Sequence, residues 1–376
     1  MILNEKADRK LISIAGGKGG VGKSILAANL GVLLATYGRR TVVVDLDLGG
    51  SNLHSYLGIK NTNIGIGNIL SDSRLMFRDA VLDTPFDNLQ FVPGDVLVAG
   101  LADITPQQRK KVSDSIMELE ADYVLLDIGS GSNAAALDFF LMSNAGLIVT
   151  TPQPPAILNA YSFLKNAFFR FVRRSFAGDK RLDSYFRSAV KDKRPGTTPE
   201  VGEIAKEINA IDKNASRKMH RHLSHLKPSL VINRAKTPGD AHMGAGLRDL
   251  VETKLGIGLQ SLGLIYEDAA VDESARDLMP VVAEAPDSLA ARQITRISQK
   301  IAQSERFPEM PLALEEYSDS FELTAMEAAN DHGEADGAEP STAELVEMIQ
   351  AQRKTIADLQ QTLRRVSVQN NLDFPS

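Results

Sequence analysis

The chain has 376 residues, of which 43% are hydrophobic, and a formal net charge of −6 at pH 7. This length allows one large α/β domain with an appendage, or two domains, and the apolar content is sufficient for a full core. Cysteine is absent, which excludes disulfides, Cys-based zinc sites, iron–sulfur clusters and cysteine nucleophiles.

Residues 1–10 are polar, and no apolar run reaches the roughly 20 residues that a membrane-spanning helix needs. We therefore expect a cytoplasmic protein without a secretory signal. Peripheral attachment to the inner membrane face or to the nucleoid stays open.

A buried strand is predicted at residues 11–15, directly before a glycine-rich loop. Residues 17–24 fit the nucleotide-binding pattern G-x-x-x-x-G-K-[ST]. The glycines let backbone N–H groups turn toward phosphate oxygens, Lys23 would reach the β- and γ-phosphates, and Ser24 would give its hydroxyl to Mg²⁺. A helix predicted over residues 25–37 adds its N-terminal dipole. A glycine-rich turn that binds nothing is the alternative, and the agreement of motif, strand and helix weighs against it.

Aspartates follow two later strands. Residues 40–45 are predicted to form a buried strand that ends in Asp45, with Asp47 two positions further on. A second buried strand, residues 123–127, ends in Asp127. One aspartate at a strand end can cap a turn, but two on alternate residues beside a phosphate loop favour ligation of Mg²⁺ and water.

Four further strands are predicted at residues 89–94, 146–151, 229–233 and 262–265. Strands that alternate with helices are typical of a parallel sheet covered on both faces. Polar residues gather at the carboxyl ends of these strands, where ligands bind in open α/β sheets. We predict an α/β fold with a mostly parallel, doubly wound sheet for residues 1–306.

A long connection separates two of these strands, whereas connections in α/β units are usually short. Residues 165–227 form this insertion, which carries 16 lysines and arginines against 7 aspartates and glutamates. One helix is predicted over residues 161–176, and a second helical pattern follows with Val201, Ile204, Ile208 and Ile211 on one face.

The first helix of the insertion mixes Arg170, Arg173 and Arg174 with phenylalanines at 168, 169 and 171. These residues could contact DNA phosphates or acidic lipid. The more frequent outcome of such a pattern is a solvated basic face with phenylalanines in the core.

The composition changes near residue 307. Residues 307–340 are rich in Pro, Glu, Asp, Ala and Gly, and we predict an acidic, disordered linker there. Residues 341–376 are predicted to form a C-terminal helix, because a capping-box spacing is followed by about three heptads of apolar residues. This helix could form a coiled coil, capture a partner helix or lie on the main domain. Residues 289–301 are amphipathic and are expected to form the last packing helix of the domain, in preference to a membrane anchor.

The sequence G-K-G-G-V-G-K-S, with Lys18 as its early lysine, resembles the deviant Walker A motif of the MinD/ParA family of P-loop ATPases. The likeness covers residues 10–306 apart from the insertion. The stretches from Asp127 and from Thr150 are most similar to the branch of flagellar-number regulators, FlhG or FleN. The resemblance implies that ATP and Mg²⁺ are bound. It also implies that the nucleotide contacts include Gly17, Lys18, Gly19, Gly20, Val21, Gly22, Lys23, Ser24 and Ile25.

The resemblance also assigns roles beyond the loop. Asp47, in a segment that resembles switch I, would orient the attacking water, and Lys18 would reach the nucleotide of a partner subunit. Mg²⁺ would be held by Ser24, Asp45, Asp47 and Asp127, and the catalytic residues would be Lys18, Lys23 and Asp47. In the segment that resembles switch II, Gly129 would offer a backbone N–H to the γ-phosphate. The adenine would be contacted by Asn233, Arg234 and Asp268, although Tyr266 stands where relatives carry a proline before this aspartate.

From this resemblance we expect a switch ATPase that dimerises with ATP and positions or counts a structure such as flagella or chemoreceptor arrays. A protein partner would bind through the insertion or the C-terminal helix. A ParA-type ATPase that partitions DNA or cargo is one alternative, and a small-molecule ligase or kinase is another. The long insertion, the acidic linker and the heptads depart from the family pattern.

Overall fold

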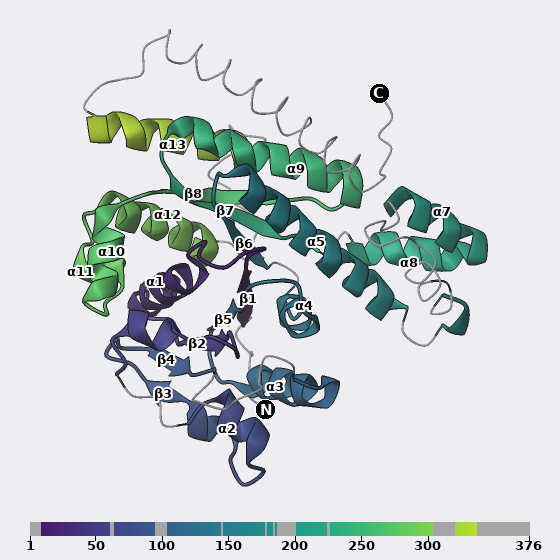
Figure 1. The fold of residues 1–376 in the computed structure, drawn as a ribbon, viewed down its shortest axis with the longest axis horizontal. Coiled ribbons are helices and arrows are strands. Elements are labelled where there is room, and N and C mark those ends of the chain that lie inside the picture. The colour runs from purple at the N-terminus through teal and green to yellow at the C-terminus, as the bar shows by residue number, and fades with distance from the viewer. Residues whose placement is uncertain are drawn as a thin grey trace, which may run out of the picture.

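The computed structural model describes residues 9–60, 64–94, 104–143, 146–176, 179–182, 185, 201–223, 226–303 and 320–336. Eight strands form one sheet in the order β3-β4-β2-β5-β1-β6-β7-β8 (Figure 1). The strands are β1 (Lys10–Ala15), β2 (Thr41–Leu46), β3 (Leu82–Asp83), β4 (Leu89–Val92), β5 (Tyr123–Ile128), β6 (Leu147–Thr150), β7 (Ser229–Ala235) and β8 (Gln260–Tyr266). All neighbours pair in parallel except β3 and β4, so the predicted sheet is confirmed.

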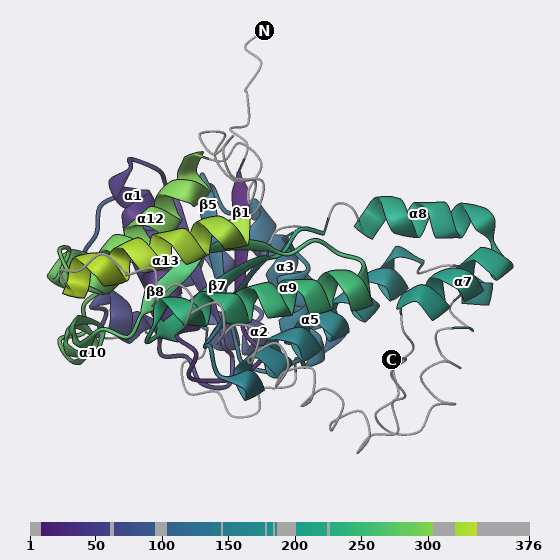
Figure 2. The ribbon, with the colours of Figure 1, turned by 90° about the horizontal axis from the view of Figure 1, so that it is seen from above.

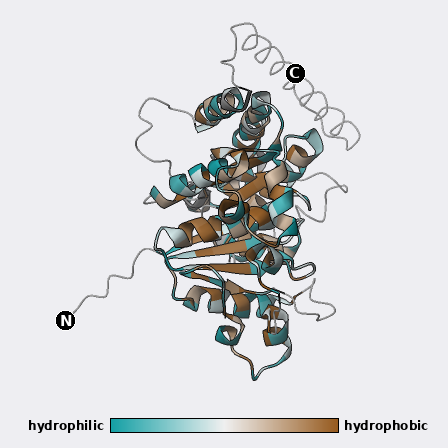
Figure 3. Ribbon diagram, turned by 90° about the vertical axis from the view of Figure 1, so that its left-hand side faces the viewer, coloured by the Kyte–Doolittle hydropathy of each residue, from teal (hydrophilic) through white to brown (hydrophobic). Residues whose placement is uncertain are grey.

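Helices cover both faces of the sheet. The first face carries α1 (Lys23–Thr36), α11 (Val281–Glu284) and α12 (Leu289–Gln303). The second face carries α3 (Pro106–Glu118), α4 (Ala134–Phe140), α5 (Pro154–Ser175) and α9 (Ala241–Leu255). Figure 3 shows the hydrophobic strands enclosed between these layers. The central strands β2 and β5 are buried at every position, as a doubly wound sheet requires.

The described chain also contains shorter elements. They are α2 (Ile66–Ser71), α10 (Ala269–Arg276), and the 3-10 turns η1 (Leu53–Leu57), η2 (Phe77–Ala80) and η4 (Pro238–Asp240). None of the helices in the described ranges is long and apolar enough to cross a membrane. Ile294, Ile297 and Ile301 of α12 are buried, which confirms that this segment is a packing helix of the domain.

The insertion is mostly helical where it is described. Helix α5 begins at Pro154, earlier than predicted, because prolines at its first positions need no N–H partner. Two further helices of the insertion, α7 (Val201–Ile211) and α8 (Lys213–Leu223), project beyond one end of the sheet (Figures 1 and 2). Ile204 and Ile208 are buried, as their spacing predicted.

The prediction of a disordered linker is wrong for part of its length. Residues 320–336, within the predicted linker 307–340, form helix α13 (Ser320–Asp336) against β8 and α9. Phe321, Leu323 and Ala328 are buried on it, so this acidic segment does carry a packing face. The rest of the predicted linker and the predicted heptad helix at 341–376 lie outside the described residues.

Candidate functional site

The glycine-rich loop joins β1 to α1 at the carboxyl edge of the sheet. Gly20 and Gly22 have φ values of 77° and 93°, a left-handed conformation that glycine adopts without steric cost. Gly17 lies so close to α5 that an added Cβ would stand 2.1 Å from the carbonyl oxygen of Asn159. Lys23 is only 7% exposed, whereas Lys18 is exposed. Close backbone packing therefore shapes the loop. The side chain of Lys23 is buried within it, and that of Lys18 faces the solvent.

Two of the predicted metal-binding aspartates lie on neighbouring strands. Asp45 of β2 pairs in register with Asp127 of β5, and both side chains are buried. Asp45 accepts hydrogen bonds from the backbone N–H of Asp47 at 3.0 Å and from the hydroxyl of Ser51 at 2.5 Å. The Oδ1 atom of Asp127 is buried and has no hydrogen-bond partner among the described residues. The strand register thus brings together carboxylates that are far apart in the sequence.

The crowding of these carboxyls changes their acidity. Burial is the largest cause that raises the pKa of Asp127 to about 8, and the negative charge of Asp45 is the second. The hydrogen bond from Ser24 and the positive charge of Lys23 act in the opposite direction. Burial raises the pKa of Asp45 to about 6, against the hydrogen bonds from Ser51 and Asp47. A buried, unpaired carboxylate oxygen beside a hydroxyl is a donor set that suits Mg²⁺. The residues present therefore fit a magnesium ion.

The described residues do not form a complete metal cage by themselves. In the ranges that the structure describes, no three His, Asp or Glu side chains are arranged so that they could hold a metal ion. Mg²⁺ usually keeps several waters and binds through one or two carboxylates together with substrate phosphates. The two carboxylates of Asp45 and Asp127 form a partial donor set of this kind.

The two predicted switch segments touch each other. A Cβ on Gly129 would stand 2.9 Å from Oδ1 of Asp47, so a larger residue at this position would displace the Asp47 side chain. Asp47 itself is partly exposed at the carboxyl edge of the sheet. The structure thus places Asp47, predicted to orient the attacking water, beside Gly129, predicted to offer its N–H to the γ-phosphate.

Asn233 contacts the phosphate loop directly. Its Nδ2 donates to the carbonyl oxygen of Val21 at 2.9 Å, and its Oδ1 accepts from the N–H of Arg234 at 2.9 Å. Arg234 has a φ of 57°, a conformation that is uncommon outside glycine. Its guanidinium pairs with Glu267 at 2.8 Å. Asn233, which the sequence predicted as an adenine contact, therefore holds the loop in place.

Asp268, which was predicted to contact the adenine, forms hydrogen bonds that the sequence did not predict. One carboxylate oxygen accepts from the N–H of Ala270 at the start of α10, and the other accepts from the N–H of Ala290 in α12, at 2.9 and 3.0 Å. Both oxygens are thus engaged by backbone groups. This aspartate fixes the segment that follows β8.

Three residues near the site were not predicted from the sequence. Ser51 bonds to Asp45, Asn159 lies against Gly17, and Tyr56 stands near enough to Asp127 for that carboxylate to raise the pKa of the phenol, after the larger effect of burial. Ser51 follows the two aspartates closely in sequence, which was a usable signal. The contact of Asn159 depends on the fold and leaves no local pattern.

Comparisons with known proteins agree with this architecture. A sequence model described as the CobQ/CobB/MinD/ParA nucleotide binding domain matches residues 12–281. The chain is 31% identical over 150 residues to a septum site-determining protein MinD of Bacillus subtilis, covering 40% of this chain and 56% of that protein. It is 31% identical over 167 residues to a flagellum site-determining protein YlxH of Helicobacter pylori, covering 43% and 55%.

Two further relatives extend the comparison. The antiactivator FleN of Pseudomonas aeruginosa is 27% identical over 158 residues, covering 42% of this chain and 55% of that protein. The chain thus spans about half the length of these curated relatives. A solved MinD of Pyrococcus horikoshii, complexed with Mg-ADP, superimposes with a TM-score of 0.53 at 22% identity, covering 78% of this chain and 96% of that chain. Since its family model covers more than half of its residues, the chain belongs to the CobQ/CobB/MinD/ParA family of nucleotide-binding proteins.

Proposed function

We propose that this protein is a switch ATPase that converts ATP and water to ADP and phosphate and dimerises in the ATP-bound form. The observation that carries the proposal is the group of carboxylates next to the phosphate loop. Asp45 and Asp127 are buried in register on adjacent strands, and Lys23 is buried beside them. Such a concentration of negative charge is stabilised when a cation binds with its nucleotide.

Each residue has a physical task in this proposal. The ammonium of Lys23 would hold the β- and γ-phosphates, and Ser24 with Asp127 would hold the magnesium side of the nucleotide. The bound metal ion would supply charge neutralisation for the phosphate oxygens. Asp47 would orient the attacking water, because its carboxylate is partly exposed at the edge of the sheet. Positioning and electrostatics account for most catalysis of phosphoryl transfer.

Dimerisation gives a role to Lys18. This side chain is exposed on the loop, so its charge is available to a nucleotide held by a second copy. Hydrolysis would remove the γ-phosphate that both subunits contact and so release the pair.

The output that we propose is positional. Relatives that match this chain are named for determining septum or flagellum sites or for antiactivation. By analogy, the dimer would place or count a cellular structure such as flagella or receptor arrays. A partner would bind the dimer through the helical insertion or the C-terminal region. The fold alone does not select the target.

The alternative of DNA partition loses support at one surface. Arg170 and Arg174, predicted as contacts for DNA phosphates, are both paired with Asp138 within the chain, and Phe168 is buried. Arg173 is exposed and has no ion pair with Asp138 among the described contacts.

The test is the oligomeric state by light scattering with ADP and with ATP, on the wild type and on Asp47→Ala. Asp47→Ala should bind ATP but fail to hydrolyse it, so we expect a monomer with ADP and a lasting dimer with ATP. Lys18→Ala is the matched variant that should bind ATP yet remain monomeric. A monomer in every state, or phosphate transfer to a metabolite, would contradict the proposal.

A further inference from the structure

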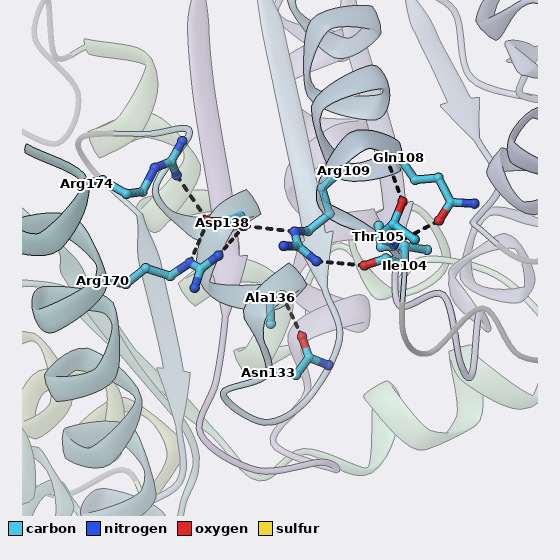
Figure 4. Close-up of polar contacts among 9 residues, drawn as sticks. All are labelled: Ile104, Thr105, Gln108, Arg109, Asn133, Ala136, Asp138, Arg170 and Arg174. Atoms are coloured by element: carbon cyan, nitrogen blue, oxygen red, sulfur yellow. Dashed lines mark hydrogen bonds and ion pairs between the residues drawn. The ribbon is translucent and has the colours of Figure 1, made fainter. Parts of the chain in front are cut away.

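One aspartate outside the nucleotide site is surrounded by three arginines. Asp138 of α4 accepts from Nε of Arg109 at 2.9 Å, from Nε of Arg170 at 2.6 Å and from Nη1 of Arg174 at 3.2 Å (Figure 4). Arg109 belongs to α3, and the other two belong to α5. We call these four residues the Asp138 cluster. It joins three helices through one carboxylate.

The cluster is partly shielded from water and unbalanced in charge. The side chains of Asp138 and Arg109 are 16% and 14% exposed. Burial raises the pKa of Asp138, but hydrogen bonding and charge from the arginines outweigh this effect and hold the pKa below its usual value. The carboxylate therefore stays ionised at neutral pH, and it alone balances three guanidinium groups within the cluster. Charge-assisted and bidentate pairs of this kind fix geometry strongly.

Helix α4 begins just after the predicted switch II, and its last turn is bonded to the central strand β1. Its first turn is capped by Asn133, which accepts from the N–H of Ala136 at 2.8 Å and follows the predicted switch II directly. Near its last turn, the carbonyl oxygen of Phe139 accepts from Ser13 of β1 at 3.0 Å. Because the helix spans only residues 134–140, a shift of switch II would move Asp138 with it.

Helix α5 connects the same cluster to the projecting part of the molecule. Its N-terminal portion lies against Gly17 of the phosphate loop. Its C-terminal portion carries Arg170 and Arg174 and leads toward α7 and α8. Phe163 packs edge-on to Phe140 of α4, with ring centroids 5.1 Å apart. We call residues 165–175 together with α7 and α8 the helical extension.

We propose that Asp138 is a positioning residue that couples switch II to the helical extension. Movement of α4 with the state of the nucleotide carries the carboxylate, and the carboxylate carries Arg170 and Arg174. The nucleotide therefore sets the position and the mobility of the surface that α7 and α8 present. This inference rests on the proposed function, since it requires that the chain bind nucleotides in two states.

The experiment compares hydrogen–deuterium exchange of the full chain with ADP and with a non-hydrolysable ATP analogue, in the wild type and in Asp138→Asn. Asn keeps the shape of the side chain but removes the charge that the arginines share. Asp114→Asn is the matched control, because Asp114 pairs with Lys110 on the exposed surface of α3. Arg174→Gln is a second, milder variant, because Arg174 is 59% exposed and makes one contact in the cluster.

In the wild type and in Asp114→Asn, exchange in the helical extension should differ between the two nucleotides by about fivefold or more, the lower end of typical coupling between sites. In Asp138→Asn this difference should fall below about twofold, and in Arg174→Gln it should be reduced. Nucleotide affinity, measured in parallel, should stay within about threefold of the wild type, because no cluster residue belongs to the site.

Two results would overturn the coupling. The first is an unchanged nucleotide-dependent difference in Asp138→Asn or, if that variant does not fold, in Arg174→Gln. The second is a wild type that dimerises with ATP but shows no difference in the extension. Failure of the proposed function looks different. A wild type that stays monomeric with ATP, but still shows an exchange difference that Asp138→Asn abolishes, would refute the dimer switch and leave the coupling supported.

Discussion

Gly17 and Gly19 stand two positions apart in the phosphate loop but have different surroundings. A Cβ on Gly17 would lie 2.1 Å from the carbonyl oxygen of Asn159, whereas a Cβ on Gly19 would have its nearest neighbour, a Ser130 atom, at 3.8 Å. Neither glycine has a positive φ, so backbone strain does not separate them. The difference between the two positions is one of packing alone.

Replacement of these glycines by alanine should therefore affect the nucleotide-free protein unequally. Gly17→Ala must displace α5 or the loop, at a cost of about 1–3 kcal/mol in the free energy of unfolding, as is usual for overpacking. Gly19→Ala should change stability by less than about 0.5 kcal/mol. Urea denaturation without nucleotide measures both. Equal destabilisation of the two variants would show that the contact with Asn159 is not the constraint.

The amide of Asn233 offers a second test at the scale of a single residue. Asn233→Asp keeps the oxygen that accepts from Arg234 but loses the N–H that holds Val21. One hydrogen bond contributes about 1 kcal/mol, so nucleotide affinity should fall about fivefold, as measured by titration calorimetry. Asn88→Asp, an exposed site at the opposite edge of the sheet, should bind nucleotide as the wild type does. An unchanged affinity in Asn233→Asp would exclude a role in holding the loop.

At the scale of elements, the strands were predictable from the sequence and α13 was not. Strands β2 and β5 are largely apolar runs with an aspartate one position before their last residue, and both features are local. Helix α13 carries few large apolar residues, and part of its packing comes from polar contacts with residues far away in the chain. Thr324 bonds to Ser261, and Ser320 accepts from the N–H of Ser261, at 2.7 and 3.0 Å. No window of sequence contains both partners.

Helix α13 packs against β8 because this strand forms the outer edge of the sheet. Strand β8 ends the strand order, and an uncovered edge strand would leave backbone groups without partners. Side chains satisfy some of them: Lys300 donates to the carbonyl oxygen of Leu262, and Gln293 accepts from the N–H of Tyr266, at 3.1 and 2.8 Å. Polar side chains of α12 and α13 thus take the place of a further strand.

The ion pair between α12 and α13 should be sensitive to loss of one partner. Lys300 is 8% exposed and pairs with Glu327 at 2.7 Å. Glu327→Gln leaves the buried ammonium without its counter-charge, which costs about 3–5 kcal/mol in such cases. The exposed Glu322→Gln on the same helix should change stability by less than about 0.5 kcal/mol. Urea denaturation distinguishes the two variants. The double variant Lys300→Met with Glu327→Leu should recover part of the loss, because it removes the buried charge but leaves the carbonyl oxygen of Leu262 without the Lys300 donor.

At the scale of the whole molecule, the phosphate loop could be predicted because its residues are contiguous. The arrangement around it could not. Asn233 and Val21 are 212 positions apart, and the pairing of Asp45 with Asp127 follows from strand order. The sequence places each aspartate at a strand end, but only the fold makes them neighbours. Their joint charge is therefore a property of the assembled sheet.

This joint charge makes global stability depend on pH when nucleotide and metal are absent. The pKa values of Asp45 and Asp127 are raised to about 6 and about 8, from a reference of 3.8. Between the reference and the raised values, the folded protein holds protons that the unfolded chain releases. The stabilisation of the folded protein by these bound protons is therefore complete below about pH 4, and it is lost as pH rises toward about 8.

Because of Asp45 and Asp127, we expect the free energy of unfolding to decrease as pH rises from about 5 to about 8. Other groups also titrate, so the comparison is with Asp127→Asn, in which most of the downward slope should disappear. Saturating Mg·ADP should also flatten the slope in the wild type, because a bound cation favours the ionised carboxylates. Urea denaturation across this pH range measures all three cases. If the wild type and Asp127→Asn had parallel profiles, the two carboxyls would not be coupled to folding, and the electrostatic reason for binding a magnesium nucleotide at this edge would be lost.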